Sequence, residues 1–188
     1  HNGWAMKQDL AWIKSQRASQ PIPAGVTVIG DDIFIEEGAI IRPSIINTEE
    51  GPVYVGKDAE IMEGSLIRGG LAVCEHSQIK MGAKIYGPTT VGPHSKVGGE
   101  VGNSVIFGYS NKGHDGYIGN TVIGEWCNLG ADTNTSNLKN NYSTVKVHNY
   151  ELNRSESTES QFCGLTMGDH SKCGINTMFN TGTVCGVF

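Results

Sequence analysis

Apolar side chains return at every sixth position along much of this chain. A half-buried strand repeats its apolar positions every second residue and an α-helix every 3.6 residues, so neither element explains this period. Four residues after each apolar position the side chain is mostly small, as at Ala59, Ser65 and Ser77. The pattern is a hexapeptide repeat. Its apolar positions run without a slip through Val55, Ile61, Ile67, Val73, Ile79, Ile85, Val91 and Val97.

A period of six fits a triangular solenoid. In such a fold three of the six-residue units make one coil, and each coil hydrogen-bonds only to its neighbours. The branched residue of each unit points into the prism, and the small residue suits a corner where the backbone turns tightly. We therefore predict a parallel β-solenoid over residues 25–188. The same interval recurs outside the central run, at Ile29, Ile35 and Ile41 and at Met167, Cys173, Phe179 and Cys185.

The segment before the solenoid, residues 1–24, is expected to form a helix and a linker. Trp4, Leu10 and Trp12 follow roughly helical spacing, which is typical of a short amphipathic helix over residues 2–17. The first coil of a solenoid exposes unpaired strand edges. We expect the helix to cap that open end.

Two interruptions of the repeat point to a functional region. After Val97 the apolar residues no longer recur at every sixth position. The repeat is recovered at Ile118, and the next apolar position, Ile123, follows after five residues. Later a polar excursion, a long loop over about 138–164, precedes the return of the repeat. Long loops in a tight solenoid are usually functional or cover a partner. We expect the shortened step to kink the solenoid and a cleft to open beside it.

Composition and charge exclude several classes of function. The 188 residues carry a net charge of -5 with scattered basic side chains, so we expect neither a nucleic-acid partner nor binding to a membrane surface. No apolar run approaches the length of a membrane span and no leader pattern opens the chain, so we expect a cytoplasmic protein. The 5 cysteines lack CxxC spacing, which favours small buried hydrophobes over a disulfide framework or a zinc knuckle.

The repeat resembles the left-handed parallel β-helix of the hexapeptide acyltransferases, a family of trimers that use acyl-CoA. The string GHDGYIG, the string NLGA and an Asn nine residues after the Asn of that string resemble one bifunctional family in particular. That family combines N-acetylglucosamine-1-phosphate uridylyltransferase with glucosamine-1-phosphate N-acetyltransferase, and the likeness is to its acetyltransferase domain. The resemblance implies an all-β, left-handed parallel β-helix with a short N-terminal helix, assembled as a homotrimer. It also implies acetyl-CoA as co-substrate and no metal required by this domain.

The resemblance further implies roles for particular residues. His114 would be the general base on the sugar amine, while Tyr117 and Asn128 would contact the sugar phosphate or the base. Ala131 and Asn137 would lie beside the CoA arm. A sugar ammonium must lose a proton before it attacks a thioester, and an imidazole is suited to accept it near neutral pH, an effect of about 10² to 10⁴ in rate.

The chain departs from the family pattern in three places. Leu138 stands where the family usually has a Tyr, and the upstream basic residues that hold the sugar phosphate find no clean match. Lys112 is a candidate substrate contact and Lys139 a candidate CoA contact by their nearness in sequence alone. No G-x-G-T-R phosphate loop is present. We therefore expect the nucleotidyltransferase domain, where the natural protein has one, to lie upstream of His1.

Several of these residues also have plain structural interpretations. His114, in the string KGHDG, could be a solvated turn residue, and Asp115 orients it only if their side chains meet. For Asn134 and Thr135 we prefer the interpretation that they satisfy backbone groups at the corners of coils, as such side chains do in turns.

Two other functions stay open beside the main hypothesis. The gamma-class carbonic anhydrases share this architecture and hold a metal through three His. In this chain His76, His94 and His114 are 18 and 20 residues apart, so they could stack on one face of the solenoid. The chain has no two His at the short spacing that such a metal site needs. The other is a non-catalytic solenoid that trimerises and regulates an upstream sugar nucleotidyltransferase. We interpret the chain as an acyl-CoA-dependent N-acetyltransferase. Its acceptor would be an aminosugar phosphate similar to glucosamine-1-phosphate, or a nucleotide amino sugar.

Overall fold

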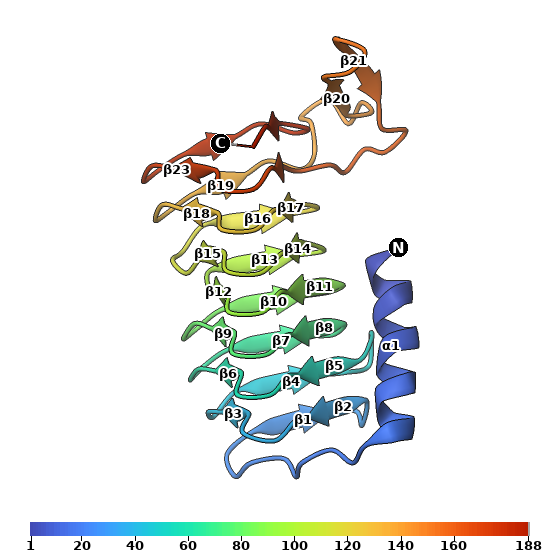
Figure 1. The fold of residues 1–188 in the computed structure, drawn as a ribbon, viewed down its shortest axis with the longest axis vertical. Helices are drawn as coiled ribbons and strands as arrows, with labels where there is room; N and C mark the ends of the chain where they lie inside the picture. Colours follow the sequence, from blue (N-terminus) through green and yellow to red (C-terminus); the bar gives the residue numbers. More distant parts are fainter. Residues whose placement is uncertain (188) are drawn as a thin grey trace.

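The computed structural model describes residues 1–187 as a parallel β-solenoid with one helix beside it (Figure 1). The predicted parallel β-helix with a short N-terminal helix is confirmed. Phe188, the last residue of the predicted range, lies outside the described residues. Within the described part of the chain, no helix combines the length and the apolar character that a bilayer crossing demands.

Three parallel sheets, here named A, B and C, form the faces of the solenoid. Sheet A contains β1 (Thr27–Ile29), β4 (Ile45–Asn47), β7 (Leu66–Arg68), β10 (Lys84–Tyr86), β13 (Glu100–Gly102) and β16 (Tyr117–Gly119). Sheet B contains β2 (Ile33–Ile35), β5 (Val53–Val55), β8 (Leu71–Val73), β11 (Thr89–Val91), β14 (Val105–Ile106), β17 (Val122–Ile123), β22 (Thr166–Met167) and β25 (Val184–Cys185). Sheet C contains β3 (Ile40–Ile41), β6 (Glu60–Ile61), β9 (Gln78–Ile79), β12 (Lys96–Val97), β15 (Asn111–Lys112), β18 (Asn128–Leu129) and β23 (Lys172–Cys173). A further pair, β19 (Asn134–Thr135) and β24 (Met178–Phe179), continues beyond β16.

The core is a column of apolar side chains from the sixth positions. Ile67 pairs with Ile85 in sheet A and Val73 pairs with Val91 in sheet B, so equivalent side chains stack from coil to coil. All four are buried. Since burying such a side chain contributes about 1.5–3 kcal/mol, each added strand extends the same core. The interval of six is therefore the packing period of the solenoid.

The repeat does not stop after Val97, contrary to the expectation that it recovers only at Ile118. Val101, Ile106 and Lys112 occupy the next inward positions, in register with the inward residues of the coil below. The steps that lead to them are four, five and six residues. A search at a fixed interval loses these positions because the corners between the strands have shortened.

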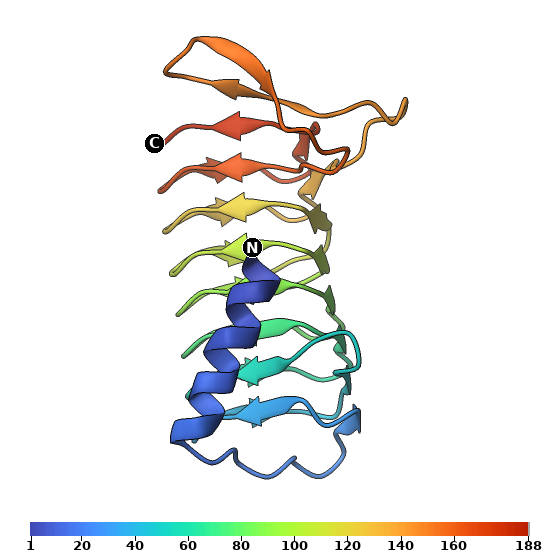
Figure 2. The same cartoon turned by 90° about the vertical axis from the view of Figure 1, so that its right-hand side faces the viewer.

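The helix α1 (Asn2–Gln16) confirms the predicted element but not its place. It runs lengthwise along the outward face of sheet B, beside β5, β8 and β11 (Figure 2). Met6 and Leu10 are its buried residues, whereas Trp4 and Trp12 are 71% and 64% exposed. The predicted apolar face included the wrong aromatic residues, because the surface of sheet B decides which side of the helix is covered.

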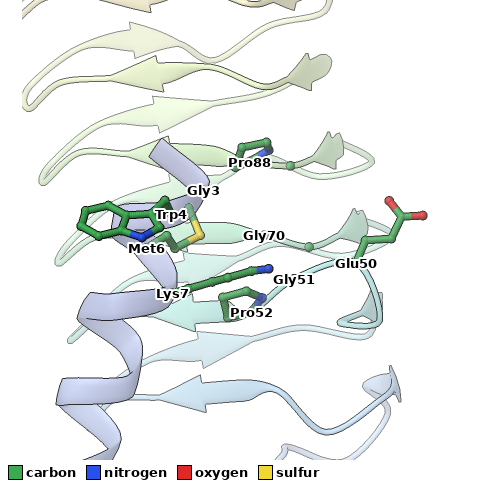
Figure 3. A pocket seen from close by; sticks show the side chains of 11 residues that line it. Gly3, Trp4, Met6, Lys7, Glu50, Gly51, Pro52, Gly70 and Pro88 are labelled. Atoms are coloured by element: carbon green, nitrogen blue, oxygen red, sulfur yellow. The ribbon is translucent and has the colours of Figure 1, made fainter. Parts of the chain in front are cut away.

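One end of α1 is held at a corner of the solenoid. The side chain of Asn2 donates to the carbonyl of Pro88 at 3.0 Å and accepts from the hydroxyl of Thr90 at 2.8 Å. A cavity of about 410 Å³ separates the first turns of the helix from a glycine-rich corner between sheets A and B (Figure 3). The exposed Trp4 lies at its rim, and Lys7 extends across it.

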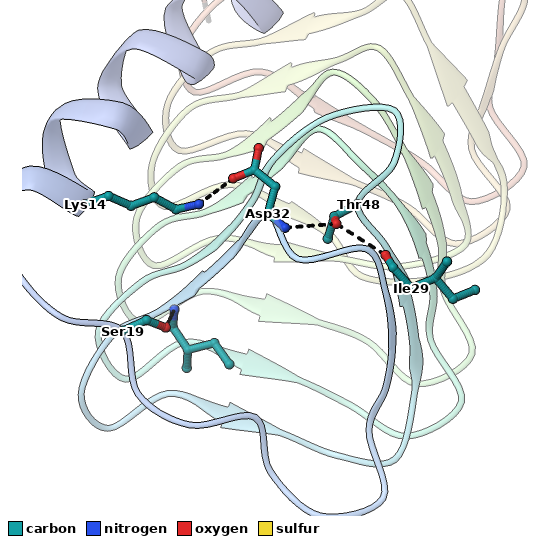
Figure 4. Close-up of polar contacts among 6 residues, drawn as sticks. Lys14, Ser19, Ile29, Asp32 and Thr48 are labelled. Carbon is teal, nitrogen blue, oxygen red and sulfur yellow. Dashed lines mark hydrogen bonds and ion pairs between the residues drawn. The ribbon is translucent and has the colours of Figure 1, made fainter.

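The linker after α1, and not the helix itself, covers the open end of the solenoid. The hydroxyl of Ser19 accepts the N–H of Ile35 at 2.9 Å, and the N–H of Gln20 donates to the carbonyl of Ile35 at 2.8 Å. An ion pair between Lys14 and Asp32 ties the end of the helix to the same coil (Figure 4). The expectation that the helix caps this end is wrong, because helical backbone groups bond within the helix and cannot pair a strand edge.

A long insertion leaves the solenoid between β19 and β22. It contains the antiparallel hairpin of β20 (Lys146–Asn149) and β21 (Arg154–Ser157), so the segment expected as a loop over about 138–164 has structure of its own. Leu138 and Phe162 form an antiparallel bridge at its base. The insertion rises beyond the coil that carries β16 and β17 (Figure 1).

Candidate active site

The corner that carries His114 joins sheet C to sheet A. It spans residues 113–116, between β15 and β16, and the side chains of His114 and Asp115 are exposed there. Gly116 closes the corner with a φ of +114°, and a Cβ at this position would lie 2.2 Å from the carbonyl oxygen of Thr133 in the next coil. Only glycine fits such a backbone and such a contact. The corner is a tightly specified turn that presents His114 outward.

Ala131 lies at the same corner, one coil farther along. The N–H of Asp132 donates to the carbonyl of Asp115 at 3.0 Å, which aligns residues 17 positions apart in the two coils. The same offset places Ala131 beside His114. Asp115 contributes its carbonyl to this contact, and the role of its carboxylate in orienting His114 stays a prediction.

Tyr117 and Asn137 meet directly on the outward side of sheet A. The Nδ2 of Asn137 donates to the hydroxyl of Tyr117 at 2.9 Å and to Oδ1 of Asn120 at 2.7 Å. Burial raises the pKa of Tyr117, while its hydrogen bonds with Tyr86 and Asn137 act in the opposite direction. The structure thus joins a predicted substrate contact to a predicted CoA contact. Asn120 was not predicted.

Asn134 and Thr135 hold the backbone of the same strand. The Oδ1 of Asn134 accepts the N–H of Tyr117 at 2.8 Å, and the buried hydroxyl of Thr135 accepts the N–H of Gly119 at 3.2 Å. Both side chains satisfy backbone groups, as expected, but these groups belong to strand β16 and not to a corner. The two contacts position Tyr117 from the coil above.

Three further polar residues on sheet A near Tyr117 were not predicted from the sequence. Glu100 is in register with Tyr117 on the neighbouring strand, and the hydroxyl of Tyr86 donates to its carboxylate at 2.8 Å. Burial, and then this hydrogen bond, raise the pKa of Tyr86. Lys84 pairs with Glu100 at 3.5 Å. A groove of about 600 Å³ along sheet A ends at these residues, and the register of the irregular coil was the signal that could have revealed them.

Three predicted site residues lie elsewhere. Asn128 faces outward on sheet C, across the corner from Tyr117, where its Oδ1 accepts the side-chain amide of Asn111 at 2.9 Å. The ammonium of Lys139 donates to a carbonyl within the insertion at 3.3 Å. Lys112 is buried in the core. The expectation that Lys112 contacts a substrate is wrong, because its strand directs the side chain into the solenoid.

Several named proteins are similar to the chain, although no family model matches it. The bifunctional protein GlmU of Marinobacter nauticus is 29% identical over 160 aligned residues, covering 77% of this chain and 34% of that protein. A bifunctional sugar-1-phosphate nucleotidylyltransferase/acetyltransferase of Sulfurisphaera tokodaii is 32% identical over 141 residues, covering 74% of this chain and 35% of that protein. GlmU of Methanocaldococcus jannaschii is 39% identical over 87 residues, covering 46% of this chain and 21% of that protein. The chain is a hexapeptide-repeat domain like that of GlmU.

The similarity to GlmU concerns only a part of each relative. The chain spans about a third of the length of two of them and about a fifth of the third. These similarities support the placement of this chain in the sugar nucleotidyltransferase/acetyltransferase family.

In this GlmU-like solenoid the three histidines considered as metal ligands lie at two different corners. His76 and His94 stack at the corner between sheets B and C with ring centroids 4.8 Å apart, and Tyr109 continues the stack at 4.9 Å. His114 lies at a different corner, between sheets C and A. Among residues 1–187, no three His, Cys, Asp or Glu side chains are grouped so that they could hold a metal ion. The structure contradicts the alternative in which the three His stack on one face.

Proposed function

We propose that the chain transfers an acetyl group from acetyl-CoA to the amine of an amino sugar. The acceptor is an aminosugar phosphate similar to glucosamine-1-phosphate, or a nucleotide amino sugar. The observation that carries the proposal is the arrangement of His114 and Ala131 at one corner, beside the hydrogen-bonded pair of Tyr117 and Asn137. Similarity to a protein named an acetyltransferase supports it.

The exposed His114 supplies the proton chemistry of this reaction. Its imidazole accepts a proton from the sugar ammonium, which frees the lone pair of the nitrogen. The nitrogen then forms a bond to the thioester carbonyl carbon, and the bond from that carbon to sulfur breaks. The departing CoA thiolate takes up the second proton of the nitrogen. The products are the N-acetyl sugar and the CoA thiol.

The side chains around Tyr117 supply binding groups for the two substrates. The hydroxyl of Tyr117 and the amide of Asn137 form one polar surface, so a sugar and the end of CoA would share it. Glu100 lies one strand away, in register with Tyr117. Its carboxylate would attract the ammonium form of the acceptor before the proton is lost.

In this proposal a second copy of the chain completes the site. Asn128 lies across the corner from Tyr117, so it reaches the same ligand only from a neighbouring subunit. Exposed Ile45 and Leu66 on the outward face of sheet A support such an association, because apolar side chains in a row favour an interface. We propose a homotrimer, with a nucleotidyltransferase domain upstream as in a bifunctional protein.

The test is release of thiol from acetyl-CoA with glucosamine-1-phosphate beside a panel of amino sugars and nucleotide amino sugars. We expect release with one acceptor, and a fall of about 10² or more in kcat for His114→Ala. His76→Ala is the matched control, since it removes an imidazole from a different corner of the solenoid. Thermal stability of His114→Ala should stay near that of the unchanged protein.

Two results would overturn the proposal. Equal activity of His114→Ala and the unchanged protein would remove the imidazole from the reaction. Absence of thiol release across the panel, together with no thermal shift on adding CoA, would instead favour a non-catalytic trimerising solenoid.

A further inference from the structure

A lysine occupies a core position next to the candidate active site. Lys112 lies on β15, in register with Val97 of β12, and takes an inward position of the kind that sheet C mostly fills with Ile, Val or Leu. It is 1% exposed. Lysine is seldom buried, because its ammonium loses hydration in an apolar interior. Its presence in an apolar column therefore calls for a specific set of partners.

The partners of Lys112 are three carbonyl groups of the backbone. Its Nζ donates to the carbonyl of His114 at 2.5 Å, to that of Asp115 at 3.1 Å and to that of Gly98 at 3.3 Å. An ammonium has three donors and no acceptor, so this set uses all of its hydrogen-bonding capacity. Two of the three acceptors belong to the corner that presents the candidate base.

The corner of His114 differs in composition from other corners along the same edge. In two other coils of the same edge a hydroxyl side chain donates to the carbonyl three residues earlier, as Ser65 and Thr133 do, whereas Ala83 holds the equivalent position in a third coil. The equivalent position here, four residues after the inward residue, is Gly116, which has no side chain. Gly116 is required by its backbone angle and its close contact. The corner therefore has no hydroxyl donor at that position, and Lys112 donates from the core to other carbonyls, those of Gly98, His114 and Asp115.

We propose that Lys112 is a positioning residue, which anchors the backbone of residues 113–116 and so holds the imidazole of His114 where acetyl transfer needs it. The inference rests on the proposed function, although the anchoring itself can be measured without any catalytic assay. An apolar side chain in place of Lys112 would leave three interior carbonyls without this donor, and the corner would shift to reach water.

The proton on Lys112 is part of this anchor. Burial lowers the pKa of Lys112 to about 8, while the nearby Asp115 and Asp132, and then Cys173, act against that shift. Near pH 7 the group is an ammonium with three donors. Above about pH 8 it becomes an amine with two donors, so it can donate to no more than two of the three carbonyls.

The first test measures the corner directly. Lys112→Met keeps an unbranched side chain of similar length but removes the donors. The N–H of Glu100 donates to the carbonyl of Gly116, and the N–H of Asp132 donates to that of Asp115. We expect hydrogen exchange at both amides to quicken by about tenfold or more. Ile61→Ala is the control, because it opens a cavity in sheet C far from this corner.

The second test separates positioning from a general loss of structure. For Lys112→Met we expect kcat to fall by about 10- to 100-fold while the KM for acetyl-CoA changes by less than about threefold. In the unchanged protein kcat should also fall above about pH 8, which gives its pH profile an alkaline limb. The profile of Lys112→Met should not show this limb. Ile61→Ala should keep both kcat and that alkaline limb.

The outcomes distinguish this inference from the proposed function. Unchanged exchange at Glu100 and Asp132 in Lys112→Met overturns the anchor, whatever the activity. Faster exchange with an unchanged kcat overturns the positioning role. If no acceptor supports thiol release, the proposed function fails, while the exchange result still decides whether Lys112 anchors the corner. Should Lys112→Met not fold, amide resonances of residues 113–116 in the unchanged protein decide: a transition near pH 8 supports the anchor, and its absence overturns it.

Discussion

Replacing Gly116 with alanine should damage the corner of His114 more than the same change at other corners of this edge. The φ of +114° costs a non-glycine residue about 1–3 kcal/mol. The added Cβ would also lie 2.2 Å from the carbonyl oxygen of Thr133, a backbone atom that cannot rotate away. We expect the free energy of unfolding to fall by about 3 kcal/mol or more.

Two other glycines separate the causes of that loss. Gly82 has a φ of +68° with open space around its Cβ position, so Gly82→Ala should cost about 1 kcal/mol from the backbone alone. Gly174 has neither a positive φ nor any atom within 4 Å of that position. Gly174→Ala should therefore leave stability unchanged or raise it by about 0.4–1 kcal/mol, through the entropy of the unfolded chain.

The assay is urea denaturation of the three variants at one protomer concentration, because assembly would otherwise shift the midpoints. The order expected for the free energy of unfolding is Gly174→Ala highest, then Gly82→Ala, then Gly116→Ala. A loss in Gly116→Ala no larger than in Gly82→Ala would show that the contact with Thr133 carries no cost. The account of a tightly specified corner would then be refuted.

Three further expectations concern the helix, the strand beneath Tyr117 and the buried lysine. Leu10→Ala should cost about 2–4 kcal/mol of helix docking, seen as faster hydrogen exchange over α1, whereas Trp4→Ala should leave that exchange unchanged because its side chain is exposed. Thr135→Val should cost about 1–3 kcal/mol in urea denaturation, because the N–H of Gly119 loses its acceptor; no loss would mean another group accepts it. For Lys112, whose folded pKa of about 8 lies below its ordinary 10.5, the unfolded chain binds more protons between those values. Stability of the unchanged protein should therefore rise with pH across that window by up to about 3 kcal/mol relative to Lys112→Met, and parallel pH curves for the two proteins would contradict this.

The fold was predictable because its pattern is local. Each inward residue from Val55 to Val97 is set by the number of residues in one strand and one corner, so a count along the chain finds it. The helix over α1 was predictable in the same way. Its place was not, because the helix docks on a surface assembled from β5, β8 and β11, strands that are far from it in sequence.

The candidate site was predictable only where its residues belong to recognisable sequence strings. His114, Tyr117 and Asn137 were found from their strings, and the structure shows that Tyr117 and Asn137 are in contact. Glu100 was missed because the coil that carries it has short corners. Its register against Tyr117 becomes visible only when the strands are paired.

By itself the sequence determined the solenoid and its inward column, since coil geometry translates a regular spacing into position. Only the tertiary structure decided that Lys112 points inward and that the linker, not the helix, pairs the open end. Both depend on partners brought close by the stacking of coils: the carbonyl of Gly98 for Lys112, and the edge of Ile35 for the linker. A residue count cannot supply these partners, because each hydrogen bond across coils depends on the register that the intervening corners allow.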